Sequence, residues 1–171
     1  MKKVIFGVLI FLLVATGCSE SVEQTEKDSK INEFEAMLKE SLTGPSEELA
    51  AIYEQFASED VDETVEALKK LDSYHKDKYG NYFKGEYFQE VLNKSMYFTV
   101  FQEKAYREGM KIKAEDIQVE RSETNDTAYD FSVNVHLSDS EEVWNVEGRI
   151  NTDENGKITR IRYTNGMEWL Q

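Results

Sequence analysis

The residue with the clearest chemical role in this sequence is Cys18, because it is the chain's only cysteine and closes an apolar stretch. The apolar run Val4–Val14 precedes it, and Lys2 and Lys3 precede that run. A basic start, a short apolar run and small residues before a cut site are typical of a secretory signal peptide. The run is shorter than the ~20 apolar residues that a membrane-spanning helix needs. We therefore expect residues 1–17 to be a cleaved signal peptide.

The segment Val14-Ala15-Thr16-Gly17-Cys18 resembles the lipobox of bacterial lipoproteins. In that family the cysteine sulfur receives diacylglycerol, the chain is cut before the cysteine, and the new amine is often acylated, for instance with palmitate. The usual residue three places before the cysteine is leucine, and Ala15 is a tolerated small residue there. The resemblance implies a lipid anchor at Cys18 in the cell membrane, with the protein outside the cytoplasm; two or three acyl chains hold stably. The alternative is a plain secreted protein with a free thiol.

Behind Cys18 the sequence is polar, and Val22 is the only apolar residue from Ser19 to Lys30. Such a stretch buries too little surface to offset its ordering entropy, so residues 18–30 are predicted to be the lipidated N-terminus and a flexible tether. Residues 31–171 are long enough for one domain with its own core. The net charge of −14 disfavours binding to nucleic acid and to anionic lipid headgroups.

Acid–base or metal chemistry has few candidate residues. The chain has two histidines. In the predicted strand, His136 lies on the same face as the polar residues, and His75 lies in a polar helix end. We therefore expect both at the surface. The sequence lacks a Gly-x-Ser-x-Gly elbow, a Gly-rich phosphate loop and a pair of histidines at metal-ligand spacing. The acidic run Asp60–Glu63 fits a helix start better than a calcium loop. We expect no catalytic residue, no metal and no cofactor.

Aromatic residues crowd the stretch between Tyr74 and Tyr106. The simpler interpretation is that these large rings fill the core between helices and sheet. The alternative is an aromatic-lined pocket for an apolar or sugar-like ligand, with a mobile lip over residues 79–85. The candidate ligand-binding residues are tyrosines whose hydroxyls need partners: Tyr79, Tyr82, Tyr87 and Tyr97.

Basic residues recur near the end of the chain, at Arg149, Arg160 and Arg162 with Lys157. We expect them to pair across strands with acids such as Glu147 or Glu141 on a wet sheet face. An anion site is the alternative.

The first half of the chain has the apolar spacing of amphipathic helices. Residues 31–42 form the first, Ser46 begins the second, and Asp60 with Glu63 fits a capping box for the third. The apolar stripe of the third helix is expected to face the core and comprises Val61, Val65, Leu68 and Leu71.

Two shorter helices are expected before Gly109, one holding Tyr87 to Leu92 and one holding Phe98 to Ala105, with Ser95 as a cap of the latter. The run 96–101 fits a strand equally well, because periodicity does not separate the two.

After Gly109 the apolar spacing changes to the alternation of strands. The alternation is clearest at 129–137 and recurs at 144–150 and 157–164, with a first strand at 112–121. Short turns between them predict a four-stranded antiparallel meander. Because the helices must cover its apolar face, the fold class is α+β.

Over residues 31–171, the order of helices followed by a closing meander resembles that of the NTF2-like (cone) fold. The hairpin before the last strand adds to this resemblance, with the sequence Asp153-Glu154-Asn155-Gly156-Lys157-Ile158. A cystatin-like or other helix-plus-meander fold is the alternative. The NTF2-like family includes isomerases and dehydratases that use an Asp or His inside the cone.

From these observations we expect a non-enzymatic, extracytoplasmic lipoprotein whose globular domain binds a protein or envelope partner. An aromatic-lined domain for a small ligand is the first alternative. An isomerase- or dehydratase-type enzyme is the second, and it would need a titratable group whose pKa is shifted by burial beside the substrate.

Overall fold

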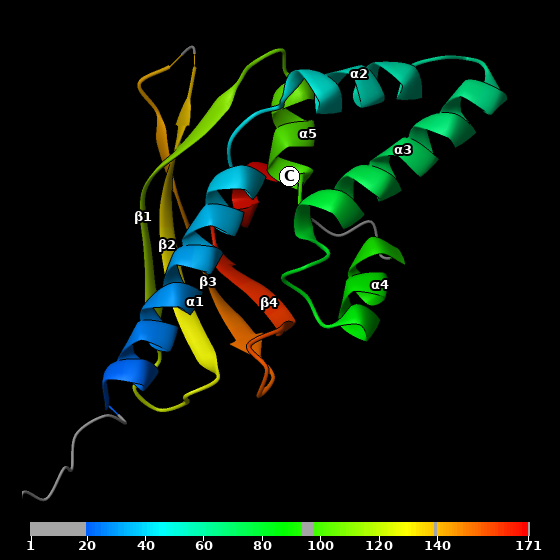
Figure 1. Ribbon diagram of the computed structural model, residues 1–171. Coiled ribbons are helices and arrows are strands. Elements are labelled where there is room, and N and C mark those ends of the chain that lie inside the picture. The colour runs from blue at the N-terminus through cyan, green and yellow to red at the C-terminus, as the bar shows by residue number, and fades with distance from the viewer. Residues whose placement is uncertain (1–19, 94–97, 139, 171) are drawn as a thin grey trace, which may run out of the picture.

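The computed structural model of the chain describes residues 20–93, 98–138 and 140–170 (Figure 1). Helices come first and strands follow, so the α+β class and the order of elements are confirmed. The helices are α1 (Glu20–Ser41), α2 (Glu47–Phe56), α3 (Val61–Tyr79), α4 (Gly85–Asn93) and α5 (Val100–Arg107). The strands are β1 (Ile112–Arg121), β2 (Ala128–Leu137), β3 (Val143–Thr152) and β4 (Ile158–Asn165), and a short 3-10 helix, η1 (Met167–Leu170), follows them.

The sheet is the predicted antiparallel meander, with strand order β1-β2-β3-β4. Its inward residues pair directly across strands, as Val133 does with Val146 and Tyr129 with Ile150. All four are buried. Between β3 and β4 the carboxylate of Asp153 accepts hydrogen bonds from the amides of Asn155 and Lys157 at 2.9 Å each. Gly156 takes the positive φ of 71° that this turn requires.

Helix α1 lies across one face of the sheet (Figure 1) and supplies the centre of the core. Phe34, Leu38 and Leu42 share one side of this helix and are buried. The ring of Phe34 meets that of Tyr129 edge-on, with centroids 5.0 Å apart. From α5, the fully buried Gln102 donates its side-chain amide to the carbonyl of Glu40 at 2.9 Å, which supports an otherwise unpaired carbonyl at the end of α1.

Helix α1 begins at Glu20, so the segment expected to be a flexible tether is helical from that residue to Lys30. The prediction of a flexible tether took account only of the scarcity of apolar residues in this segment. The segment is rich in Glu, Lys and Gln, which have high helix propensity. A helix that is already nucleated by the packed part of α1 extends at little further cost. Within the described residues, none of the helices is long and apolar enough to cross a membrane.

Helices α2 and α3 form a hairpin that projects to one side of the sheet (Figure 1). Their caps are those expected: Ser46 accepts from the amide of Leu49, and Asp60 accepts from the amide of Asp62 at 2.8 Å. The capping box is only half present. The amide of Asp60 donates to the hydroxyl of Ser58 at 3.2 Å instead of to Glu63.

The prediction that the apolar stripe of α3 faces the core was wrong. Val61 is 74 % exposed, Leu68 is 51 % exposed and Val65 is 44 % exposed. Leu71 alone of the stripe is partly buried. Helix α3 contributes Tyr74 and Tyr79 to the core instead, so most of the stripe is left in solvent.

Candidate binding groove between α2 and α3

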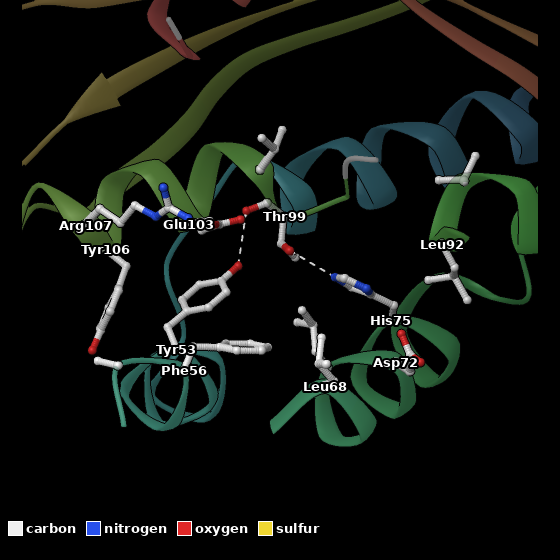
Figure 2. A pocket seen from close by; sticks show the side chains of 14 residues that line it. Tyr53, Phe56, Leu68, Asp72, His75, Leu92, Thr99, Glu103, Tyr106 and Arg107 are labelled. Carbon is white, nitrogen blue, oxygen red and sulfur yellow. Dashed lines mark hydrogen bonds and ion pairs between the residues drawn. The ribbon is translucent and has the colours of Figure 1, made fainter. Parts of the chain in front are cut away.

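A cavity of about 540 Å³ opens between the helical hairpin and α5 (Figure 2). Side chains from α2, α3, α4 and α5 point into it, and we call it the α2–α3 groove. Its apolar lining comprises Phe56, Ala57, Leu68, Leu71, Val91, Leu92 and Val100. Its polar and aromatic lining comprises Tyr53, Asp72, His75, Thr99, Glu103, Tyr106 and Arg107. A cavity of this size, mostly apolar with a few polar groups, has the composition of a binding site.

The inner wall of the groove is a small polar network around Thr99 (Figure 2). The Nε2 atom of His75 lies 3.0 Å from the hydroxyl of Thr99, and either group can donate. The hydroxyl of Tyr53 donates to the backbone carbonyl of Thr99 at 3.3 Å. The three residues come from α3, from the residue before α5 and from α2. The network therefore ties the hairpin to the rest of the domain.

The expectation that His75 lies at the surface was wrong, because its side chain is buried against aromatic rings. The residue is only 9 % exposed, and its ring centroid is 5.7 Å from that of Phe98 and 6.3 Å from that of Tyr79. A sequence signal for this was present. Leu71, His75 and Tyr79 follow one another at four-residue spacing and so share one helix face.

Burial also sets the charge of the groove wall. It lowers the pKa of His75 to about 4, so the imidazole is neutral at pH 7. It raises the pKa of the Tyr53 hydroxyl, which stays protonated. A general base works best when its pKa is near the working pH, and an imidazole with a pKa of about 4 is a poor proton acceptor. Asp72 lines the same groove, but no hydrogen bond joins it to His75 in the described part of the chain.

The mouth of the groove mixes apolar and charged side chains. Leu68 and Asp72 are both exposed and lie one helical turn apart on α3. Across the opening, Glu103 and Arg107 form an ion pair on the exposed side of α5. Because that pair is neutral overall, no cation among the described residues pairs with the negative charge of Asp72 at the rim.

A second cavity, of about 460 Å³, lies between α4 and β4 and holds one of the predicted ligand-binding residues, Tyr87. The amide of Ile161 donates to the Tyr87 hydroxyl at 2.9 Å, which leaves the hydroxyl proton available. Phe83 stacks against Tyr87 at 6.0 Å and meets Phe98 edge-on at 4.8 Å. Burial raises the pKa of Tyr163, which lines the same cavity.

Of the other candidate tyrosines, Tyr79 and Tyr82 do not line this cavity. Tyr79 is fully buried in the core, stacked on Phe98 at 4.7 Å, and its hydroxyl has no hydrogen-bond partner among the described residues. Tyr82 is partly buried against the core. Tyr97 lies outside the described residues, as do Ser95 and Cys18.

The segment imagined as a lip over a pocket is hydrogen bonded to the start of β4. The amide of Ile158 donates to the carbonyl of Tyr82, and the amide of Lys84 donates to the carbonyl of Ile158, both at 2.9 Å. These bonds form a short parallel bridge between Phe83 and Ile158. The segment is thus held against β4, the edge strand of the sheet, and Phe83 within it contributes to the wall of the cavity between α4 and β4.

On the outer face of the sheet, an ion pair joins neighbouring strands, but it involves neither Arg160 nor Arg162 and neither of the acids that were expected. Arg149 forms a two-pronged ion pair with Asp130, at 2.6 and 2.8 Å. Within the described ranges, Arg160 and Arg162 form no ion pair. His136 lies on this face, 3.4 Å from Glu115, as its strand parity predicted.

No cluster of His, Cys, Asp and Glu side chains with the geometry of a metal site occurs among the described residues. Sequence reasoning missed the groove itself, since Phe56, Leu68 and Thr99 were assigned to ordinary helix packing or not singled out. Comparison with known protein families, curated proteins and solved structures finds no match to this chain.

Proposed function

We propose that this chain is an extracytoplasmic lipoprotein, anchored in the cell membrane through acylated Cys18, whose domain binds a protein or envelope partner without catalysing a reaction. The anchoring part is supported by the sequence of the first 18 residues: a basic start, a short apolar run and a lipobox-like segment that ends at the lone cysteine. We also propose the cone arrangement of the NTF2-like fold, on the grounds of helices that precede and cover a closing four-stranded meander.

The observation that carries the binding proposal is the α2–α3 groove. It is open to solvent, lined by apolar and aromatic side chains with several polar ones, and includes the exposed side chain of Leu68. Apolar side chains gathered around a hollow of the surface mark interaction sites more often than scattered ones do. A partner that covers this surface would remove it from water and gain free energy in proportion to the apolar area buried.

The chemistry of the groove favours binding over catalysis. His75 is neutral, its proton affinity is low, and its one hydrogen-bond partner in the groove is a threonine. A hydrolytic or isomerising site would need a base of suitable pKa, a group that orients it and donors for the developing negative charge. Tyr53, His75 and Thr99 instead bond to one another, and Glu103 pairs with Arg107, which is how a binding surface keeps its shape.

A second candidate function is the binding of a small, ring-shaped ligand in the cavity between α4 and β4. Its support is the wall of Phe83, Tyr87 and Phe98, together with the Tyr87 hydroxyl, which donates to no acceptor within the described residues. Aromatic faces that carry a hydroxyl suit apolar or sugar-like ligands.

Site-specific photo-crosslinking in intact cells tests the main proposal. A benzophenone amino acid replaces Leu68 in the full-length protein, and the control places it at Arg162 on the outer face of the sheet. We expect a discrete protein adduct from position 68 that position 162 does not give. The proposal fails if both positions give the same adducts, or if neither gives one above the background of a cytoplasmic control protein.

A further inference from the structure

We propose that the α2–α3 groove docks an amphipathic helix of a partner protein, with a basic polar face. This inference rests on the proposed function and names the chemistry of the partner. Two features of the surface carry it: the shape and apolar lining of the groove, and the unpaired acidic side chains of the hairpin that borders it.

The apolar feature is the groove together with the exposed apolar stripe of α3 that leads away from it, and we call the two together the apolar trough. Leu68 lines the groove, and Val65 and Val61 follow it on the same face of the helix, all exposed. Phe56 of α2 lines the opposite wall (Figure 2). Apolar residues three and four positions apart on a docked helix match a trough of this kind, with one side chain inserted in the cavity and others along the stripe. The cavity of about 540 Å³ has room for such an anchor.

The charge feature is a strong excess of acid on the hairpin. All the acidic residues from the start of α2 to the end of α3 are exposed: Glu47, Glu48, Glu54, Glu59, Asp60, Asp62, Glu63, Glu66, Asp72 and Asp77. The basic residues of the same stretch are Lys69, Lys70, Lys76 and Lys78.

Few of these acids are neutralised by the chain itself. Within the described residues, Glu66 is the one acid of the hairpin that forms an ion pair, with Lys69 at 3.7 Å. Lys78 pairs with Glu40 of α1 at 3.0 Å, and Lys70 donates to the amide oxygen of Gln55 at 3.1 Å. The hairpin that carries the apolar stripe therefore has an excess of acids without cations, and one of them, Asp72, lines the groove itself. Lysine and arginine on the polar face of a docked helix would pair with them.

The same charge argues against other occupants. A second copy would bring an identical acidic hairpin to the surface, and like charges brought together oppose association. An anionic lipid surface is repelled for the same reason. A basic helix gains from both features, since its apolar side fills the trough while its charged side faces the acids.

The test uses the purified chain without its first 17 residues, with Cys18→Ser, and model peptides of about 14 residues, which is about four helical turns. The probe peptide has Leu at helical spacing and Lys elsewhere. One control peptide replaces Lys by Glu, and another has the same Leu and Lys content in strict alternation. Calorimetry measures the affinity, and amide chemical shifts identify the surface that is used.

We expect the helical Leu/Lys peptide to bind, with shifts confined to α2, α3 and α5. Leu68→Gln should weaken binding about tenfold, since it removes an apolar contact. Val143→Gln, a matched change at an exposed valine of β3, should leave the affinity unchanged. Asp72→Asn should weaken binding, more so at low salt, whereas Glu154→Gln in the β3–β4 turn should not. Circular dichroism confirms that each variant is folded.

Several results would overturn the inference: no binding of the helical peptide, equal binding of the Glu peptide, equal affinity of Leu68→Gln and the unaltered domain, or dimerisation through this face. These results are distinct from failure of the proposed function. A protein adduct at position 68 in cells, combined with no binding of the basic peptide, would leave partner binding intact and reject the basic helix.

Discussion

The imidazole of His75 lies 3.0 Å from the hydroxyl of Thr99 and joins the end of α3 to the start of α5. Both residues are buried, and the carbonyl of Thr99 also accepts the hydroxyl proton of Tyr53 from α2. Thr99 is thus hydrogen bonded to two side chains of the hairpin, one from α2 and one from α3. We infer that these contacts fix the angle at which the hairpin projects from the sheet, and with it the width of the groove.

The first prediction concerns the stability of this contact at low pH. The pKa of His75 is about 4 in the folded chain and near 6.5 when exposed, so the unfolded chain binds the proton more tightly. The stabilisation is complete above pH 6.5 and is lost as the pH falls from 6.5 toward 4. The full loss is about 3 kcal/mol at ~1.4 kcal/mol per pKa unit. Urea unfolding at a series of pH values measures it.

The matched variants for this prediction are His75→Gln, which keeps a hydrogen-bonding side chain but does not titrate, and His136→Gln on the outer sheet face. We expect His75→Gln to flatten the fall in unfolding free energy between pH 6.5 and 4, and His136→Gln to retain it. The acids of the groove, Asp72 and Glu103, are present in all three proteins, so their contribution cancels in the comparison. An identical slope for the His75→Gln and unaltered proteins would contradict burial of the imidazole.

The second prediction contrasts two leucines. Leu38 on α1 is 1 % exposed, whereas Leu68 on α3 is 51 % exposed. Leu38→Ala should lower the free energy of unfolding by about 2–5 kcal/mol, as large-to-small changes in a core do. Leu68→Ala should change it by less than about 1 kcal/mol, because much of the side chain is already in water. Chemical denaturation gives both values, and similar losses would mean that the α3 stripe is covered in solution.

The sheet and the helix starts were predictable from the sequence because local signals specify them. Alternation of apolar and polar residues identifies a strand wherever one sheet face is buried, as at 129–137. Ser46 and Asp60 cap helices through bonds to amides two or three residues away, so no distant partner is involved.

The α2–α3 groove was not predictable from the sequence, because it depends on which helix faces are covered by other parts of the fold. The stripe of Val61, Val65 and Leu68 has the spacing of a core face, and periodicity does not reveal that the described parts of the domain leave it exposed. His75 was judged from its polar neighbours in sequence, whereas its burial is decided by Phe98 and Tyr79. Thr99 has no local motif at all, and its role comes from contacts to two other helices.

The third prediction tests the link between α4 and β4. Tyr87→Phe removes the acceptor for the amide of Ile161 and should cost about 1 kcal/mol of unfolding free energy. It should also speed hydrogen exchange at the Ile161 amide, because that amide lies on the edge of the sheet. Tyr82→Phe is the matched control, since the Tyr82 hydroxyl forms no hydrogen bond within the described residues. Unchanged exchange at Ile161 in Tyr87→Phe would show that the bond does not form in solution.

The fourth prediction addresses the anchor at Cys18, which lies outside the described residues. Radiolabelled palmitate should enter the full-length protein in a bacterial host, and Cys18→Ala should abolish the label, because only a thiol at the cut site accepts diacylglycerol. Ser19→Ala, one residue further on, should keep the label and controls for disturbance of the leader. The unaltered protein should sediment with membranes, since two or three acyl chains hold a protein stably where one is marginal. Equal labelling of Cys18→Ala, or release of the unaltered protein into the medium with a free thiol, would reject the anchor and leave the groove to be explained in a freely diffusing protein.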